Sequence, residues 1–281
     1  MAFLLEFFYI CEKNFMKHKD IFVLLFYFLF SSVNISAQDV INPIGKEIHL
    51  KYVRPKVSKI KIKAPVKVIL KISSEINYTD VEIKGHKNII SLLRVKAKDN
   101  ELFIEFETNK IIKSNDYPIV NITMPSIAKI SLLRTAELVS ISPLILKNLS
   151  VNVSDASIAK FPVLDVEYLT FNVSGSSIVK VVNLKKSKKL NIVLSGVSDF
   201  IIQKCESVEQ ANLSVSGSSD LKIRNVYAKN VKIDVSGTSS AYIYASEFVE
   251  VNASGASDVF IYGNPKKITK HIADKSNLLI K

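Results

Sequence analysis

The sequence has no tryptophan, and it has only eight glycines and eight prolines among 281 residues. So little glycine and proline excludes a collagen-like or low-complexity chain. Histidine is scarce as well, and the four histidines never occur at the spacing of metal ligands. They lie at His18, His49, His86 and His271. We therefore expect no metal site, zinc included, and no cofactor.

Cysteine is almost absent: the chain has only Cys11 and Cys205. Removal of an N-terminal segment that ends near Ala37 would leave Cys205 alone, so no disulfide is expected within the processed chain. No cysteine lies at that cleavage point to carry a lipid. The sequence also lacks a Gly-x-Ser-x-Gly nucleophile elbow and a glycine-rich phosphate loop. These absences favour a protein that is not an enzyme.

The N-terminus has the features of a secretory signal. Residues 21–30 form an apolar run that follows a lysine-containing stretch and precedes a short polar segment. The run is too short to cross a bilayer comfortably. We interpret residues 1–37 as a signal segment whose true start is Met16, and we expect no stable membrane span after cleavage. The alternative is an N-terminal membrane anchor, because residues 1–10 are also largely apolar.

The chain is strongly basic, with a formal net charge of +12 at pH 7. The predicted signal carries equal numbers of acidic and basic residues, so processing would not change this charge. A basic surface is compatible with anionic partners. Nucleic acid is not expected among them, because the basic residues are not interleaved with aromatic residues and export removes the usual target. Alternatively, the lysines fill the solvent faces of strands and discourage edge pairing.

A Ser-x-x-Ser motif recurs in the second half of the chain, and glycine is the second residue in all copies but the first. Subtraction of residue numbers gives spacings of 20, 21, 21, 20 and 18 between the first serines. A fixed period near 20 is typical of a solenoid. The copies begin at Ser154, Ser174, Ser195, Ser216, Ser236 and Ser254.

Apolar and polar residues alternate on both sides of each motif, as in strands with one buried face. A coil of about 20 residues cannot bury its own apolar face, so such coils must stack. We therefore predict an all-β fold: a single-stranded, right-handed parallel β-helix with serine–glycine corners. Degenerate coils are expected near residues 133–139 and 272–280. The alternative architecture is an antiparallel sandwich with regularly spaced turns.

The first half lacks the serine motif but also alternates like strands. Asp99 and Asn100 predict a hairpin turn. We interpret residues 38–281 as one β-helix domain, with residues 57–125 as its opening coils and cap and residues 131–281 as its repeat coils. The strands predicted in the first half are residues 59–63, 66–72, 81–84 and 89–96.

Three corners extend to Ser-Gly-x-Ser-Asp. Together with residues 261–265 and 99–104, these corners resemble the auto-transporter adhesin head GIN domain family, over about residues 57–281. The resemblance implies an exported β-helical protein of a Gram-negative envelope, in the periplasm or at the cell surface, with adhesion as its expected role. It brings no catalytic residues. The corner aspartates are Asp199, Asp220 and Asp258.

The aspartate corners are the first candidate site. Asp199 and Asp220 should lie one coil apart, roughly 5 Å by strand spacing. Two carboxylates this close could act as acid and nucleophile in glycoside cleavage, or hold a calcium ion with serine oxygens. The alternative is a solvated corner in which aspartate accepts turn hydrogen bonds. No histidine, arginine or lysine recurs in the same register to complete a catalytic site.

Aromatic residues on the last repeat coils are the second candidate site. The register predicts Tyr242 over Phe260 and Tyr244 over Tyr262. Such ladders either bind glycans or serve only as good strand formers that shield the end of the core. The candidate binding residues are thus Asp199, Asp220, Asp258, Tyr242, Tyr244, Phe260 and Tyr262.

We therefore predict a non-catalytic, exported envelope protein whose partner is a glycan or a cell-surface protein. The alternatives are a glycan-active enzyme built on Asp199 and Asp220, and a periplasmic assembly factor that uses its return loops as a partner surface. The sequence leaves the identity of the ligand and the oligomeric state open.

Overall fold

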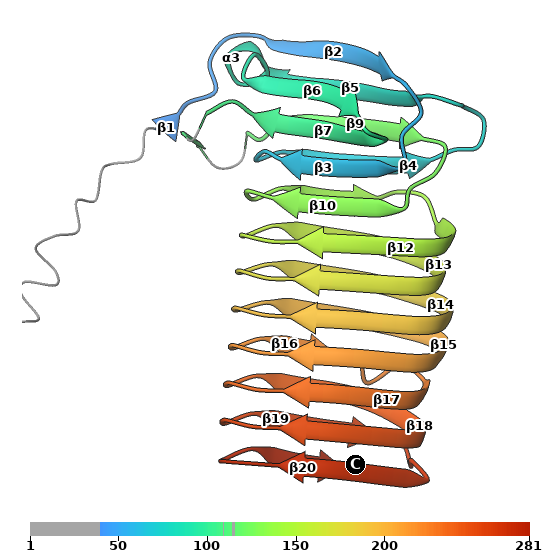
Figure 1. Cartoon of the computed structure of the whole chain (residues 1–281). Helices are drawn as coiled ribbons and strands as arrows, with labels where there is room; N and C mark the ends of the chain where they lie inside the picture. Colours follow the sequence, from blue (N-terminus) through green and yellow to red (C-terminus); the bar gives the residue numbers. More distant parts are fainter. Residues whose placement is uncertain (1–39, 109, 114–115) are drawn as a thin grey trace, which may run out of the picture. The chain divides into compact units, whose positions relative to one another are not determined.

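The computed structural model describes residues 40–108, 110–113 and 116–281. The predicted signal segment, residues 1–37, lies outside them. Residues 40–281 form one compact unit that consists almost entirely of stacked β-coils (Figure 1). Among the described residues the one helix is the single turn α3 (Lys87–Ile90).

In the regular part of the stack each long strand runs from one serine–glycine corner to the next. It leaves one corner, bends around the far side of the stack and ends at the corner of the following coil. Neighbouring coils pair in parallel and in register, so that Val151, Phe171 and Ile192 lie side by side. The regular coils are built by β12 (Leu144–Val153), β13 (Ile158–Val173), β14 (Ile178–Leu194) and β15 (Asp199–Val215). The predicted parallel stacking of coils is confirmed, and the antiparallel sandwich is wrong.

The later coils continue this pairing with shorter strands. In the coil that follows β15, the first strand ends after three residues, and pairing resumes only at Ala228. The degenerate coil predicted for residues 272–280 is present. The later strands are β16 (Asp220–Lys222), β17 (Ala228–Val235), β18 (Ser240–Ala253), β19 (Asp258–Tyr262), β20 (Lys267–Ile272) and β21 (Asn277–Ile280).

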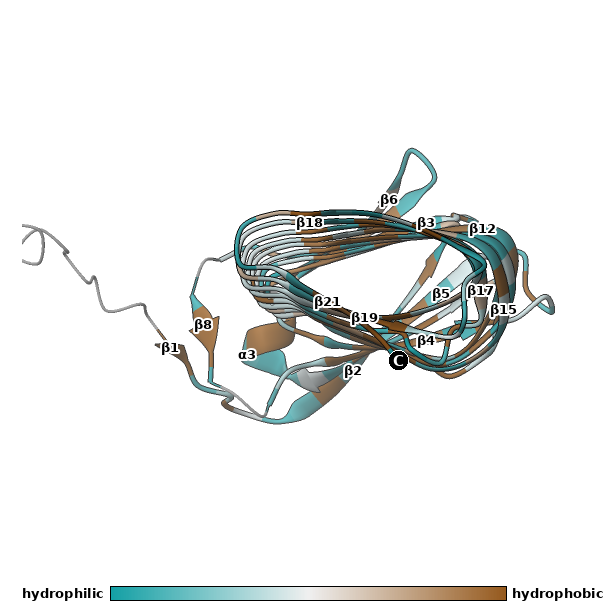
Figure 2. Ribbon diagram, turned by 90° about the horizontal axis from the view of Figure 1, so that it is seen from below, coloured by the Kyte–Doolittle hydropathy of each residue, from teal (hydrophilic) through white to brown (hydrophobic). Residues whose placement is uncertain are grey.

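The core lies inside the coils, which superpose as one flattened ring when seen along the stack (Figure 2). Alternate side chains of each strand point inward and form ladders, such as Val179, Phe200 and Leu221. The ring of Phe200 lies 4.8 Å from that of Phe171, edge to face. Burying one such side chain is worth about 1.5–3 kcal/mol, so stacking provides the apolar burial that an isolated coil lacks.

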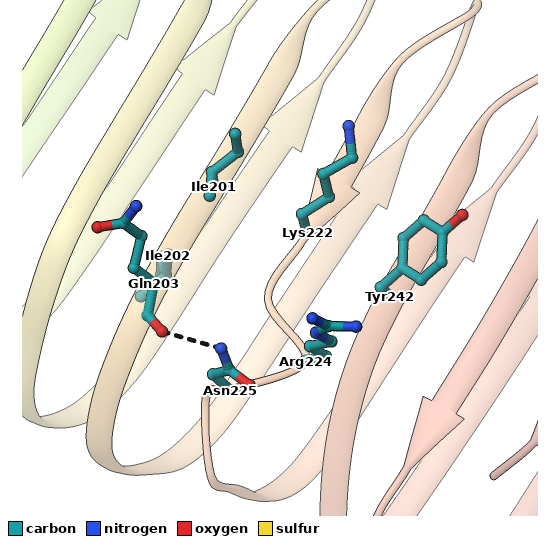
Figure 3. Close-up of a pocket in the computed structure, with 7 residues that line it drawn as sticks. All are labelled: Ile201, Ile202, Gln203, Lys222, Arg224, Asn225 and Tyr242. Atoms are coloured by element: carbon teal, nitrogen blue, oxygen red, sulfur yellow. Dashed lines mark hydrogen bonds between the residues drawn. The ribbon is translucent and has the colours of Figure 1, made fainter.

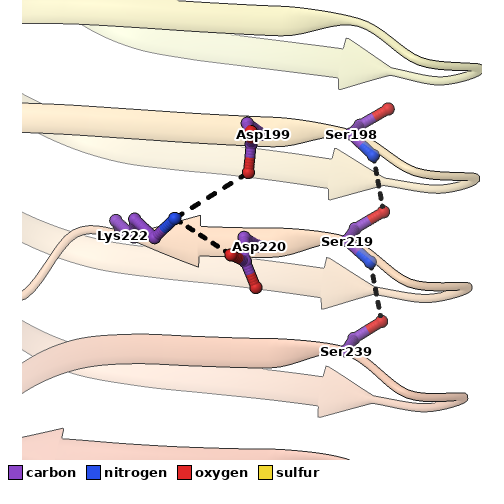
Figure 4. A network of polar contacts seen from close by, with 6 residues as sticks. All are labelled: Ser198, Asp199, Ser219, Asp220, Lys222 and Ser239. Carbon is purple, nitrogen blue, oxygen red and sulfur yellow. Dashed lines mark hydrogen bonds and ion pairs between the residues drawn. The ribbon is translucent and has the colours of Figure 1, made fainter.

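The corners are held together by backbone and serine hydrogen bonds between coils. The second serine of each corner is buried, and the backbone N–H of Ser198 donates to Ser219 Oγ at 3.3 Å. Ser219 repeats this bond with Ser239 Oγ, also at 3.3 Å (Figure 4). Asp155 replaces glycine in the first corner and adopts the same left-handed backbone, with φ of 67°. The repeated motif is thus a ladder of interlocked turns.

The opening coils are stacked in an order that differs from the chain order. The coil of β3 and β4 lies between the coil of β10 and β11 and that of β7 and β9. After β4 the chain therefore builds the outer coil of β7 and β9. It then returns past the coil of β3 and β4 and starts β10 on the other side of that coil. These strands are β3 (Lys59–Lys63), β4 (Lys67–Ile72), β7 (Glu101–Phe106), β9 (Ile119–Met124), β10 (Lys129–Leu133) and β11 (Glu137–Ser140).

Antiparallel strands cap this end of the stack. β5 (Thr79–His86) pairs with β9, and β2 (Glu47–Arg54) pairs with β5. β6 (Leu93–Lys98) and β7 form the predicted hairpin, whose turn residues Asp99 and Asn100 have φ of 53° and 61°. A small sheet of β1 (Val40–Ile41) and β8 (Ile111–Ile112) lies beside the cap.

The strand predicted for residues 89–96 is wrong at its start, because α3 occupies residues 87–90 and β6 begins at Leu93. Ile89 and Ile90 are both buried. Adjacent side chains of a strand point to opposite faces, so a strand would bury only one of them. One helical turn buries both against the end of the core.

Candidate functional site

All seven candidate binding residues lie on one outer face of the stack. This surface, which we call the acidic–aromatic face, is formed by the outward side chains of β15, β16, β18, β19 and β21. It has two full columns and part of a third. The first column is Asp199, Asp220, Ser240, Asp258 and Asn277, the second is Ile201, Lys222, Tyr242, Phe260 and Leu279, and the third includes Tyr244 and Tyr262. The tertiary structure therefore joins the two candidate sites into one surface.

Asp199 and Asp220 are neighbours in the first column, and a lysine links them (Figure 4). The ammonium of Lys222 lies 2.9 Å from Asp220 Oδ2 and 3.9 Å from Asp199 Oδ1. The hydrogen bond to Asp220 raises the pKa of Lys222, and the charges of both carboxylates add to this shift. Lys222 is outside the aspartates' own register, and it reaches them from two residues further along the strand, where alternation returns a side chain to the same face.

Asp258 does not join this pair, because Ser240 separates it from Asp220 in the column. Its Oδ1 instead accepts a hydrogen bond from the side-chain amide of Asn277 at 2.9 Å. Within the described ranges no three His, Cys, Asp or Glu side chains come together as metal ligands. The aspartate corners are thus one ion-paired cluster and one separate hydrogen-bonded residue.

The aromatic residues form a stack with a cation at one end. The rings of Tyr242 and Phe260 are parallel within 8° and 4.6 Å apart. Tyr244 and Tyr262 are register neighbours, and the ring of Tyr244 meets Tyr227 edge to face at 5.0 Å. Lys281 Nζ lies over the ring of Phe260 at 4.9 Å and over that of Tyr262 at 5.7 Å. One face of Tyr242 is covered by Phe260, so its other face is turned toward the coil of Lys222.

A hollow of about 490 Å³ opens beside Tyr242 (Figure 3). It exists because β16 ends at Lys222, after which the chain turns away from the sheet. The N–H of Ile223 donates to the carbonyl of Tyr242 at 2.9 Å, and the side-chain amide of Asn225 donates to the carbonyl of Gln203 at 2.9 Å. The lining residues are Ile201, Ile202, Gln203, Lys222, Arg224, Asn225 and Tyr242.

Sequence reasoning missed Arg224 and this hollow. Ile223 and Val226, both buried, keep the three-residue spacing of Ile202 and Cys205 in the preceding coil. The apolar pattern thus looks regular where the strand is broken, so it carries no signal for the hollow.

Cys205 is a core residue and not a reactive thiol. Burial raises the pKa of the Cys205 thiol to about 12, and the sulfur lies 3.6 Å from the carbonyl of Lys185. We expect the folded protein to react with a disulfide reagent at pH 8 roughly 1,000-fold more slowly than the urea-unfolded chain. The thiol's pKa is about 12 in the folded protein against an ordinary value of 9.0, and this difference lowers the population of the reactive thiolate by about that factor. Absorbance of the released thiolate measures both rates, and equal rates would contradict the burial.

The same burial makes the thiol's contribution to stability depend on pH. The folded pKa lies above the ordinary value of 9.0, so the neutral thiol's contribution is fully present below pH 9. It is lost as the pH rises from about 9 toward about 12. Cys205→Ala should therefore show a shallower loss of stability in that window.

A parallel stack of short coils with serine–glycine corners, closed at one end by antiparallel strands, defines the protein as a β-solenoid. The chain belongs to the family described as "putative auto-transporter adhesin, head GIN domain", which matches residues 57–265. The resemblance inferred from the corners is therefore confirmed. Family membership supports an adhesin or binding role and a protein that is exported or at the cell surface.

Solved structures with the same fold include a putative adhesin from Parabacteroides distasonis, which is 20% identical with a TM-score of 0.78 over 86% of this chain and 100% of that one. A putative adhesin from Parabacteroides merdae is 19% identical, with a TM-score of 0.76 over 86% of this chain and 99% of that one. A putative lipid binding protein from Parabacteroides distasonis is 14% identical, with a TM-score of 0.77 over 86% and 100%. No curated protein matches the chain. At these identities the likeness establishes the fold alone.

Proposed function

We propose that this protein is a non-catalytic envelope adhesin that binds glycan through the acidic–aromatic face. The observation that carries the proposal is the stacked pair Tyr242 and Phe260 beside the open hollow. The signal predicted for residues 1–37 and the adhesin family support export. In the described part of the chain no helix is long and apolar enough to cross a membrane.

The chemistry of the face suits a sugar. Binding sites combine apolar and aromatic walls with a few polar groups that fix orientation. Here Tyr242 and Ile201 offer apolar surface, and Gln203 and Asn225 offer amide groups. Tyr242 stands on a strand held on both sides by neighbouring coils. Side chains mounted on strands are positioned more precisely than side chains on loops.

The glycosidase alternative receives less support from the same face. Asp199 and Asp220 share the ammonium of Lys222 and have side chains that are 46% and 40% exposed, whereas substrate sites are usually concave and bury most of the ligand. Release of reducing ends from a bound polysaccharide, lost in Asp199→Asn, would favour the enzyme over the adhesin.

Tyr242→Ala tests the binding role. Loss of the stacked platform is expected to weaken binding to the glycans that an array identifies by roughly tenfold, because aromatic contacts and their buried area are removed together. Titration calorimetry on the purified protein measures the affinity. Tyr168→Ala is the matched control: Tyr168 is 41% exposed and lies on the part of β13 that leads to the next corner, away from the acidic–aromatic face, with Lys188 Nζ over its ring.

Unchanged affinity in Tyr242→Ala would place the glycan elsewhere on the molecule. Equal losses of glycan affinity in Tyr242→Ala and Tyr168→Ala would also count against this face. Removal of any exposed aromatic ring would then have the same effect, whichever face carries it.

A further inference from the structure

The hollow beside Tyr242 contains a cation that no carboxylate of the described residues neutralises. Of the two basic residues that line it, Lys222 is paired with Asp220 and Asp199. Arg224 is exposed on the loop that follows β16, and it has no carboxylate within 4 Å among the residues that the structure describes. A guanidinium is always charged and presents its donors as a planar fork.

We propose that the hollow binds the carboxylate of an acidic sugar, with Arg224 as its partner and the part of the Tyr242 ring that lines the hollow as the platform for the sugar ring. This inference rests on the glycan-binding function proposed above and specifies the class of glycan. It concerns a uronic-acid type of sugar, with one carboxylate on the ring.

The charges of the hollow set the number of negative charges on the ligand. Lys222 is already engaged by two carboxylates, so Arg224 is the one cation of the lining that is left for a ligand. One guanidinium matches one carboxylate, which it can bind through two parallel hydrogen bonds. A ligand with many negative charges would find only one available cation, Arg224, in the hollow.

The position of the aspartates orients the ligand. Asp199 and Asp220 lie on the corner side of Lys222, whereas Arg224 follows Lys222 in the chain on the side away from the corner (Figures 3 and 4). An anionic group would be repelled at the corner and attracted at the loop. The sugar's carboxylate therefore points away from the serine–glycine corner.

The size and walls of the hollow agree with this occupant. Its volume of about 490 Å³ lies within the usual range of small-molecule sites, roughly 300–1,000 Å³. Phe260 covers one face of the Tyr242 ring, and Lys222 is the register neighbour on the other side, where the hollow opens beyond the end of β16. The amide of Gln203 lines the opposite side, within the same hollow.

The test compares uronic-acid oligosaccharides with the same molecules after chemical reduction of their carboxyl groups. Galacturonate, glucuronate and mannuronate oligomers, their reduced forms and sulfated neutral oligomers are titrated into the full protein at two salt concentrations. The wild type is expected to prefer the acidic members by roughly tenfold, as for a charge-assisted pair. Arg224→Gln should bind both forms equally, at the affinity of the reduced form.

Lys229→Gln is the matched control, because it removes the same charge from an exposed position on β17 outside the hollow. The Lys229→Gln variant should keep the wild type's full preference for acidic over reduced oligosaccharides. Arg224 is exposed, so its replacement should leave the thermal unfolding curve unchanged, which separates lost recognition from lost folding.

Each other outcome counts against the inference. A preference that survives in Arg224→Gln, or that falls equally in Lys229→Gln, would trace to the net charge of +12. Equal binding of acidic and reduced forms by the wild type would overturn the carboxylate site and leave the glycan adhesin standing. Preference for sulfated oligomers would overturn the carboxylate assignment. Binding of no glycan at all would overturn both proposals and point to a protein partner.

Discussion

Phe200→Ala is expected to lower the free energy of unfolding by about 3–5 kcal/mol, the range for a large buried aromatic residue. Phe200 is fully buried, its ring contacts that of Phe171, and its neighbours in the ladder are Val179 and Leu221. The flanking coils are tied to one another by strand pairing, so they cannot close around the space that the ring leaves. Urea unfolding followed by circular dichroism measures the loss.

Val197→Ala in the same coil is the control for Phe200→Ala. Val197 is 65% exposed at the corner, so its truncation should change stability by no more than about 0.5 kcal/mol. Coils interact mainly with their neighbours, and the stack can therefore unfold in stages. A loss below about 1 kcal/mol for Phe200→Ala would mean that the interior repacks freely, contrary to the ladder described here.

Gly217→Ala is expected to destabilise the protein by about 2–5 kcal/mol. Gly217 has φ of 79°, a conformation that costs alanine about 1–2 kcal/mol. A Cβ there would also lie 2.4 Å from the carbonyl oxygen of Gly196 in the preceding coil. That oxygen accepts the N–H of Ser218, so moving it breaks a hydrogen bond between coils. Such overpacking typically adds about 1–3 kcal/mol.

Gly45→Ala separates the conformational cost of alanine at a positive φ from the cost of overpacking between coils. Gly45 has φ of 87°, but nothing lies within 4 Å of the position that its Cβ would take. Its replacement should therefore show only the conformational cost, about 1–2 kcal/mol. The difference between the two variants in midpoint of urea unfolding isolates the effect of close stacking. Equal effects would show that the corners are not packed as tightly as the structure has them.

The family and the candidate residues followed from one feature, the repeated corner. Because each coil is stacked on an equivalent one, sequence spacing translates directly into spatial neighbours. The stacking of Tyr242 on Phe260 and the adjacency of Asp199 and Asp220 could be predicted for that reason. Lys222 was within reach of the same reasoning, because a residue two positions along a strand returns to the same face.

The cap end was less predictable, because its pairings are not periodic. Alternation identified strands there, but it could not show that the coil of β3 and β4 is inserted between two later coils. Alternation also missed α3, whose adjacent isoleucines are both buried at the end of the core. The order of coils depends on which edge each strand meets, and that is a long-range choice with no local pattern.

By itself, the sequence determined the parallel stack, the registers of the corners and the adjacency of the candidate residues from coil to coil, since a repeat near 20 residues with one apolar face can be buried only by stacking equivalent coils. Only the tertiary structure decided that the acidic and aromatic candidates share one face, that Lys222 joins the aspartates, and that the strand breaks at Ile223 to leave Arg224 beside an open hollow. The apolar spacing of that coil is the same as in the coil before it, so the break depends on hydrogen bonds that the loop makes to the adjacent coils, at Tyr242 and Gln203.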